Sequence, residues 1–350
     1  MAAIDSTAAG LIPDPEFALA QGRWVKLICG ASNQDLPAIA DLCAVFGAAG
    51  VHCVDVAADP AVVRAAREGF GWLAEQGLPV PWLMVSLSDG ADAHFRKAWF
   101  DPQFCPSDCS RPCERVCPAG AIASPQGVLA DRCYGCGRCL PACPRGLIEE
   151  HEHRLDVDEV ATSLADLRPD AIEIHTAPGR AEAFESVVSA LASSAVPLRR
   201  LAVSCGLEGH GLTPPHLSWE LWQRHHCLRR YRFRPLWQLD GRPMSGDVGS
   251  GTARAAVNLW RAMQPLAPPG PLQLAGGTNA STLSLLSWEE RPAGIAFGGM
   301  ARRLLMPLLL SAQARGEPLR ESPQDWTKAL ELAASLVQPW LERPLAGNSC

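Results

Sequence analysis

The sequence predicts an α/β protein organised as a (β/α)8 barrel, with a cysteine-rich lobe inserted after the third strand. Eight short apolar segments are each followed by a stretch with helical spacing, which is the strand and helix count of such a barrel. The segments are apolar along their whole length, as expected for parallel strands buried on both faces. An open doubly wound α/β sheet has the same alternation and is the alternative fold.

The first part of the scaffold contributes three strands, expected at 25–31 (VKLICGA), 53–58 (CVDVAA) and 82–87 (WLMVSL). A helix is expected over 37–49, because Pro37 suits a first helical turn and apolar residues then recur at helical spacing. A second helix is expected over 61–76. Two strand–helix units therefore precede the third strand.

After the insertion the same alternation resumes. Five further strands are expected at 171–176, 200–205, 236–240, 272–277 and 294–299. The helices are expected at 157–168, 181–193, 252–264, 280–288 and 301–314. The barrel domain thus comprises residues 23–87 and 157–340, with an N-terminal tail at 1–22 and a C-terminal tail at 341–350.

The insertion, residues 88–156, lies between the third strand and the helix that follows it. In a (β/α)8 barrel such strand-to-helix connections lie at the C-terminal ends of the strands, which form the mouth of the barrel and carry active sites. We therefore expect the lobe to overhang this mouth.

The lobe contains a motif of the form C-x2-C-x2-C-x3-C-P, made by Cys133, Cys136, Cys139 and Cys143 with Pro144. A related motif with x3-x3-x3 spacing precedes it, made by Cys105, Cys109, Cys113 and Cys117 with Pro118. The two motifs end alike, in CPAGAI at 117–122 and CPRGLI at 143–148, which indicates an internal duplication.

This pattern is that of a bacterial-type two-cluster ferredoxin, in which the fourth cysteine of each motif ligates the other [4Fe–4S] cluster. Cluster A is then expected to be held by Cys105, Cys109, Cys113 and Cys143. Cluster B is expected to be held by Cys133, Cys136, Cys139 and Cys117. The wider spacing of the first motif leaves open whether cluster A is a full [4Fe–4S] cluster.

Zinc is the competing metal. A zinc ribbon uses two C-x2-C pairs that are separated by a long spacer. In this chain the cysteines of each motif instead follow one another at short spacings and end in Cys-Pro, which argues against zinc. A lobe of this size buries too little apolar surface to fold alone, so we expect its stability to depend on cluster binding. Five arginines lie among the ligands, where they form a solvated rim or offset cluster charge: Arg111, Arg115, Arg132, Arg138 and Arg145.

The composition of the chain argues against several classes of protein, namely nucleic-acid-binding, secreted and membrane-spanning proteins. The chain has 350 residues, 47% of them hydrophobic, and a formal net charge of −6, which argues against nucleic acid as a partner. Its one basic run, 224–237, is expected to be a solvated helix face or a protein-binding surface. The sequence has no secretory signal pattern and no apolar stretch long enough for a transmembrane segment, so we expect a cytoplasmic protein. Fourteen cysteines in a reducing compartment favour metal ligation over disulfides.

Several polar residues end the expected strands and would line the mouth, among them Asp55, Ser86, His175, Cys205 and Asp240. His175 would be a general acid or a hydrogen-bonded structural histidine. The glycine-rich strand ends suit a phosphate of FMN or another phosphorylated ligand, or simply tight turns. The residues of that candidate site are Gly276, Gly277, Thr278, Asn279, Gly298 and Gly299.

Several long segments resemble a known family: 27–70, the doubled cysteine motif, 242–256 (RPMSGDVGSGTARAA), QLAGGTN and GIAFGGMARR. They look like the cyanobacterial light-dependent period (LdpA) family, over about Val25 to Arg315. The resemblance implies an iron–sulfur protein in the input to the circadian clock, which senses cellular redox state as a proxy for light. It also implies association with clock proteins such as KaiA and CikA. The resemblance implies a cluster-binding role for the eight cysteines between 105 and 143.

Two functions remain open. In the first, the protein is a non-enzymatic redox sensor: the clusters exchange electrons with a ferredoxin or the quinone pool, and their oxidation state alters a partner surface. In the second, it is a ferredoxin-linked oxidoreductase that passes electrons from the clusters to a flavin or small substrate at the mouth. The sequence shows no complete acid–base constellation, which favours the sensor.

Overall fold

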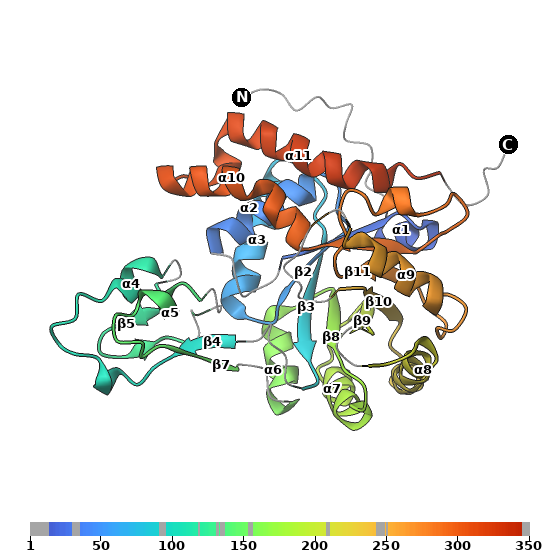
Figure 1. Ribbon diagram of the computed structural model, residues 1–350, viewed down its shortest axis with the longest axis horizontal. Helices are drawn as coiled ribbons and strands as arrows, with labels where there is room; N and C mark the ends of the chain where they lie inside the picture. Colours follow the sequence, from blue (N-terminus) through green and yellow to red (C-terminus); the bar gives the residue numbers. More distant parts are fainter. Residues whose placement is uncertain are drawn as a thin grey trace.

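The computed structural model describes residues 14–29, 36–90, 96–117, 120–130, 133, 137–152, 157–207, 211–242, 249 and 251–344. Its centre is a closed barrel of parallel strands in the order β1-β12-β11-β10-β9-β8-β3-β2. Helices surround this barrel, and the inserted lobe projects from one side (Figure 1). The barrel is confirmed, and the open sheet is excluded.

The barrel strands agree with those expected from sequence to within a few residues. They are β1 (Trp24–Ile28), β2 (Cys53–Ala57), β3 (Trp82–Ser88), β8 (Ala171–His175), β9 (Arg200–Cys205), β10 (Pro235–Asp240), β11 (Leu272–Ala275) and β12 (Gly294–Phe297). The strand expected at 272–277 ends early because Gly276 and Gly277 have φ angles of 65° and 88°. These left-handed conformations suit glycine and end extended structure.

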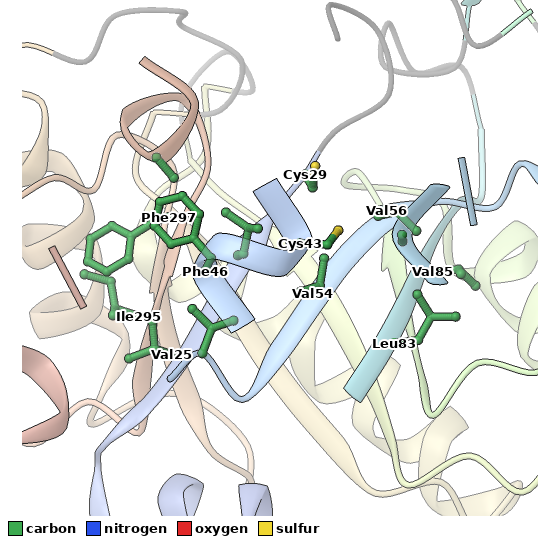
Figure 2. Close-up of a cluster of buried hydrophobic side chains, with 14 of the residues drawn as sticks. Val25, Cys29, Cys43, Phe46, Val54, Val56, Leu83, Val85, Ile295 and Phe297 are labelled. Carbon is green, nitrogen blue, oxygen red and sulfur yellow. The ribbon is translucent and has the colours of Figure 1, made fainter. Parts of the chain in front are cut away.

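Alternate strand residues face the surrounding helices and form the main core. Figure 2 shows Val25 and Ile295 close to Phe46 of α2 (Leu36–Ala48), with Val54 and Val85 in the same buried cluster. Cys29 and Cys43 are fully buried in the same core. Burial and the neighbouring Cys29 thiol raise the pKa of Cys43, so these cysteines pack as small apolar side chains.

The helices around the barrel are α2, α3 (Pro60–Glu75), α6 (Val157–Leu167), α7 (Ala181–Ser193), α8 (Pro214–Arg230), α9 (Ala253–Met263), α10 (Gly299–Arg315) and α11 (Pro323–Leu341). Of the helices in the described ranges, none is both long and apolar enough to cross a membrane.

Two helix expectations were wrong. The helix expected over 280–288 is only a 3-10 turn, η2 (Leu283–Leu285), because the Asn279 side chain accepts from the Ser281 N–H at 2.8 Å and favours a turn. The basic run 224–237 is not one surface: it divides between α8 and β10. Within it Arg224 is buried and paired with Glu220 at 2.6 Å.

Both predicted tails include residues that contact the barrel. Residues 15–21 form a helix, α1 (Pro15–Gln21), whose first N–H groups donate to the Asp14 carboxylate at 2.9 and 3.3 Å. Its Leu19 packs against Trp24 at the N-terminal end of the barrel. Arg343, expected in the C-terminal tail, is buried and donates to the Gly22 carbonyl at 3.3 Å. Helix α1 and Arg343 therefore help to close the N-terminal end of the barrel.

The inserted lobe is built of short elements. They are β4 (Arg96–Trp99), η1 (Pro102–Phe104), α4 (Pro112–Val116), β5 (Ile122–Ala123), β6 (Gly127–Val128), α5 (Cys139–Ala142) and β7 (Glu149–Glu152). The Nζ of Lys97 lies 2.6 Å from Oδ2 of Asp59, the residue that caps α3, so the lobe contacts the mouth side of the barrel.

Candidate metal centres and the barrel interior

The strands of the lobe pair crosswise between the two cysteine motifs. β4 precedes the first motif and pairs antiparallel with β7, which follows the second. β5 follows the first motif and pairs with β6, which precedes the second. The end of each motif is thereby tied to the beginning of the other, as exchange of the fourth ligand requires.

The fourth cysteine of each motif lies in the same local turn. The Ala121 N–H donates to Sγ of Cys117 at 3.2 Å, and the Leu147 N–H donates to Sγ of Cys143 at 3.4 Å. Burial alone would raise the pKa of Cys143. Hydrogen bonds from backbone N–H groups outweigh this effect and lower the pKa, and the Leu147 N–H contributes most among them. At Cys143 these groups favour the thiolate, which is the form that binds iron.

The thiols assigned to cluster A lie close enough to influence one another's ionisation. Burial raises the pKa of Cys105, and the neighbouring Cys109 and Cys143 thiols raise it further. Burial also raises the pKa of Cys113, with Cys143 and Cys105 adding to it. Cys143 of the second motif is thus a neighbour of the first motif.

Three of the four residues assigned to cluster B are described. Cys133 and Cys139 are buried in the core of the lobe, and Cys117 is partly buried against it. Cys136 lies outside the described residues. Within the described ranges, no three His, Cys, Asp or Glu side chains converge on one metal ion. A cubane does not require such convergence, because each thiolate binds a different iron.

The core of the lobe is small, and cysteines supply three of its eight buried residues in the described part of the chain. Besides Cys113, Cys133 and Cys139, its buried residues are Ala98, Phe100, Ala121, Ile122 and Ile148. So little apolar surface cannot offset the conformational entropy of ordering the lobe. Among the arginines expected at the rim, Arg111 pairs with Glu114 at 3.3 Å and its N–H donates to Cys109 Sγ at 3.4 Å.

The glycine-rich strand ends hold neighbouring loops together. A Cβ on Gly276 would lie 2.9 Å from the backbone nitrogens of Gly241 and Arg242. The Thr278 hydroxyl donates to the Ala296 carbonyl, and Asn279 Nδ2 donates to the Gly249 carbonyl at 2.9 Å. Gly298 and Gly299 begin α10. These contacts give the residues a structural role, and a flavin or phosphate site among them stays a prediction.

A charged network that the sequence reasoning missed fills the centre of the barrel. The Nζ of Lys26 lies 2.8 Å from Oδ2 of Asp55 and also contacts Oε2 of Glu173. All three side chains are buried. The signal was a charged residue in the middle of an otherwise apolar strand, as in VKLI and AIEI.

Amide and indole groups extend the network across the barrel. Gln238 Nε2 donates to Glu173 Oε1 at 2.7 Å, and Gln273 Nε2 donates to Gln238 Oε1 at 2.8 Å. Trp24 Nε1 donates to Gln273 Oε1 at 2.6 Å. The polar groups of the barrel centre therefore satisfy one another, as buried polar groups must.

The network shifts the ionisation of its members. Burial alone would lower the pKa of Lys26. The neighbouring charges of Asp55 and Glu173 outweigh burial and raise this pKa, so Lys26 stays protonated. Burial would raise the pKa of Glu173, but Lys26 and His175 lower it. Burial and the Glu173 charge raise the pKa of Asp240 to about 6. The pKa of Asp55 is also raised to about 6, and burial is the main cause.

Comparison with known proteins connects both parts of the chain to one family. A profile described as the LdpA Fe-S cluster-binding domain matches residues 105–154, and the light dependent period A C-terminal domain matches residues 163–339. Light dependent period A of Synechococcus elongatus is 46% identical over 334 residues, which cover 93% of each chain. The chain belongs to the LdpA family. It is an iron–sulfur protein related to a light-dependent period protein.

The lobe has relatives of its own outside the LdpA family. Electron transport protein HydN of Escherichia coli K12 is 49% identical over 41 residues, 11% of this chain and 23% of that protein. A ferredoxin of Methanocaldococcus jannaschii, MJ0265, is 44% identical over 50 residues, 13% of this chain and 30% of that protein. These matches support the ferredoxin-like character of the lobe.

Solved structures resemble the LdpA-family chain only weakly. Type I 3-dehydroquinate dehydratase from Clostridium difficile has a TM-score of 0.39 at 10% identity, covering 89% of this chain and 92% of that one. The carboxyl transferase domain of Rhizobium etli pyruvate carboxylase has a TM-score of 0.43 at 10% identity, covering 96% of this chain and 50% of that one.

Proposed function

We propose that this LdpA-family protein is an iron–sulfur redox sensor that conveys cellular redox or light state to the circadian clock. The observation that carries the proposal is the duplicated eight-cysteine lobe, whose strands pair crosswise and which is anchored at the mouth of the barrel. The relation of this lobe to an electron transport protein and a ferredoxin supports electron exchange as its role.

The cysteines fit two [4Fe–4S] clusters. Cluster A would be held by Cys105, Cys109, Cys113 and Cys143, and cluster B by Cys133, Cys136, Cys139 and Cys117. Partial burial of the thiols and the N–H groups aimed at Cys117 and Cys143 support this assignment. Bound there, the clusters would accept and release single electrons, each of which changes the local charge by one unit.

Lys97 is the residue best placed to transmit such a change. Its Nζ donates to the Ala130 carbonyl, three residues before Cys133, and pairs with Asp59 at the start of α3. A change of one unit in cluster charge would act on the Lys97 ammonium more strongly in this partly buried setting than in bulk water. Such a change would shift the populations of two arrangements of the Lys97–Asp59 contact if its energy differs between them.

The partners follow from the family. Clock proteins such as KaiA and CikA are the proposed receivers of the signal, and a ferredoxin or the quinone pool is the proposed electron partner. The relation of the lobe to an electron transport protein and to a ferredoxin supports electron exchange with another carrier.

The test begins with anaerobic purification, iron and sulfide quantification, and mass spectrometry for any retained organic cofactor. Binding of purified KaiA and CikA is then measured with the protein reduced by dithionite and reoxidised by ferricyanide. We expect iron and sulfide in equal amounts and an affinity that differs between the two states. Zinc in place of iron, or affinities that are identical, would refute the sensor. Bound flavin with turnover from a reduced donor would favour the oxidoreductase instead.

A further inference from the structure

The two cysteine motifs of the lobe lie at different distances from the barrel. Arg138, directly before Cys139 of the second motif, lines a pocket of about 260 Å³ together with residues of α2 and α10. The chain between β4 and α4, which carries Cys105 of the first motif, follows the end of the lobe farthest from the barrel (Figure 1). The second motif therefore faces the barrel, and the first motif faces away from it.

An aromatic side chain is exposed in the first motif. Phe104, directly before Cys105, is 72% exposed. The 3-10 turn η1 orders the backbone at this point, because the Asp101 carboxylate accepts from the Gln103 N–H at 2.9 Å. The Cys105 N–H donates to the Pro102 carbonyl at 3.1 Å and closes the turn. A large apolar side chain presented to water by an ordered turn suits burial against another protein, where aromatic residues contribute strongly to binding.

Two exposed arginines lie near other predicted ligands of cluster A. Arg115 follows Cys113 by two residues, and Arg145 follows Cys143 by two residues. Both arginines are exposed, and neither forms an ion pair with another residue in the described part of the chain. Phe104 and these arginines thus each lie within two residues of a predicted ligand of the same cluster.

The acidic residues of the first motif do not balance these arginines. Glu114 is already paired with Arg111 at 3.3 Å, which leaves Asp108. A [4Fe–4S] cluster with four thiolates is itself anionic, and exposed arginines beside it offset that charge where another protein would approach. Because opposite charges steer association and set its orientation, an acidic protein is the partner that these cations favour.

We propose that Phe104, Arg115 and Arg145 form the docking surface for an acidic one-electron carrier protein of the ferredoxin class. Phe104 is buried against the carrier, and the two arginines pair with its carboxylates at the rim. One electron leaves the reduced carrier, which is thereby oxidised, and reduces the lobe; no bond forms or breaks. The inference rests on the proposed redox function, since it names the surface at which the lobe receives its electrons.

This surface is separate from the contacts through which the lobe meets the barrel. Lys97 and Arg138 lie on the barrel side, where Lys97 pairs with Asp59 and Arg138 shares its pocket with α2 and α10. A carrier on the outer end of the lobe would therefore leave these contacts in place. Variants of the docking surface should slow electron entry without releasing the lobe from the barrel.

The first measurement is binding of an oxidised, acidic [2Fe–2S] ferredoxin to the full chain with its clusters, by anaerobic isothermal titration calorimetry at low ionic strength. Phe104→Ala should weaken binding about tenfold. Arg115→Gln and Arg145→Gln should each weaken it about three- to tenfold, and their effect should shrink at high salt, where exposed charges are screened. Iron and sulfide contents equal to those of the wild type show that the variants keep their clusters.

The second measurement is the rate at which reduced ferredoxin reduces the lobe, followed by stopped-flow absorbance below saturation. Phe104→Ala should be reduced about tenfold more slowly than the wild type. Dithionite, a small reductant that needs no docking surface, should reduce both proteins at the same rate. The matched controls are Trp288→Ala, 71% exposed on the barrel, and Arg229→Gln, exposed on α8. Both should behave as the wild type in the two measurements.

Three outcomes would overturn the proposal. The first is a wild-type chain that does not bind the ferredoxin, and the second is wild-type affinity and reduction rate in Phe104→Ala. The third is loss of KaiA or CikA binding in Phe104→Ala with ferredoxin binding intact, which would assign the surface to a clock protein. The test of the redox sensor uses dithionite and ferricyanide in place of a carrier protein, so its result does not depend on this surface.

Discussion

Lys97 of the inserted lobe forms an ion pair with Asp59 of the barrel, Nζ to Oδ2 at 2.6 Å. Asp59 is also the N-cap of α3, since its Oδ1 accepts from the Ala61 N–H at 2.8 Å and the Val62 N–H at 3.3 Å. One carboxylate thus begins a barrel helix and anchors the lobe. The contact therefore joins the lobe directly to the scaffold.

Lys97→Met should uncouple the lobe from the barrel. Both partners are largely buried, and a charge-assisted hydrogen bond of this kind is worth about 1.5–3 kcal/mol. We expect a loss of that order in the free energy of urea unfolding and a smaller difference in partner affinity between reduced and oxidised protein. Lys328→Met, at an exposed position of α11, is the control and should change neither. If the affinity of Lys97→Met for its partners differs between the reduced and oxidised states as much as that of the wild type, the Lys97–Asp59 contact does not transmit the signal.

Exchange of the fourth ligand can be tested with pairs of serine variants. If Cys143 serves the first motif, Cys113→Ser and Cys143→Ser damage the same cluster, and the double variant keeps about half of the iron. Cys139→Ser with Cys143→Ser then damages both clusters, and most of the iron is lost. Anaerobic iron analysis and EPR of the reduced protein distinguish the two pairs. The reverse result would show that each motif holds its own cluster.

Cys227→Ser is the control for these variants. This cysteine lies on α8, outside the lobe, and is buried among apolar side chains. Its replacement should leave the iron content unchanged, even if the barrel becomes less stable.

Asp240→Asn should stabilise the protein above pH 6. The pKa of Asp240 is raised from 3.8 to about 6 by folding, so between these values the native state binds more protons than the unfolded state. The contribution of this carboxyl to stability therefore falls as pH rises through about 6. We expect Asp240→Asn to raise the free energy of unfolding by about 1–3 kcal/mol at pH 8, and by little at pH 4.

Urea unfolding at the two pH values measures this difference. Asp166→Asn, at an exposed position of α6, is the control and should show no comparable gain. A loss of stability in Asp240→Asn at pH 8 would mean that its hydrogen bonds outweigh the cost of the buried charge.

The barrel was predictable because each of its strands is a short apolar run with its own turn signal. Leu201 and Val203, for example, lie in a buried strand between a helix and a loop. α8 was missed because its buried face includes Arg224 and His225 beside Leu217 and Leu221, while Trp219 is exposed. Hydropathy alone does not separate such a helix from a polar loop.

The cysteine motifs predict a set of ligands for the lobe, because their spacing is local in sequence. The barrel network was not predictable in the same way. Lys26 and Glu173 are 147 residues apart and meet only because strand register and barrel closure point both side chains inward. A single charged residue within an apolar strand signals such a network but does not identify its partner.

Lys26→Met should be strongly destabilising, because it leaves Asp55 and Glu173 as buried carboxylates without their cation. Removal of one partner from a buried ion pair costs about 3–5 kcal/mol. In the variant both carboxyl groups bind protons more readily when folded than when unfolded, so the loss should shrink as pH falls below about 5. Adding Glu173→Gln should recover part of the stability at pH 7, as measured by urea unfolding. If Lys26→Met unfolds at the wild-type urea concentration at pH 7, the ion pairs contribute nothing to the fold.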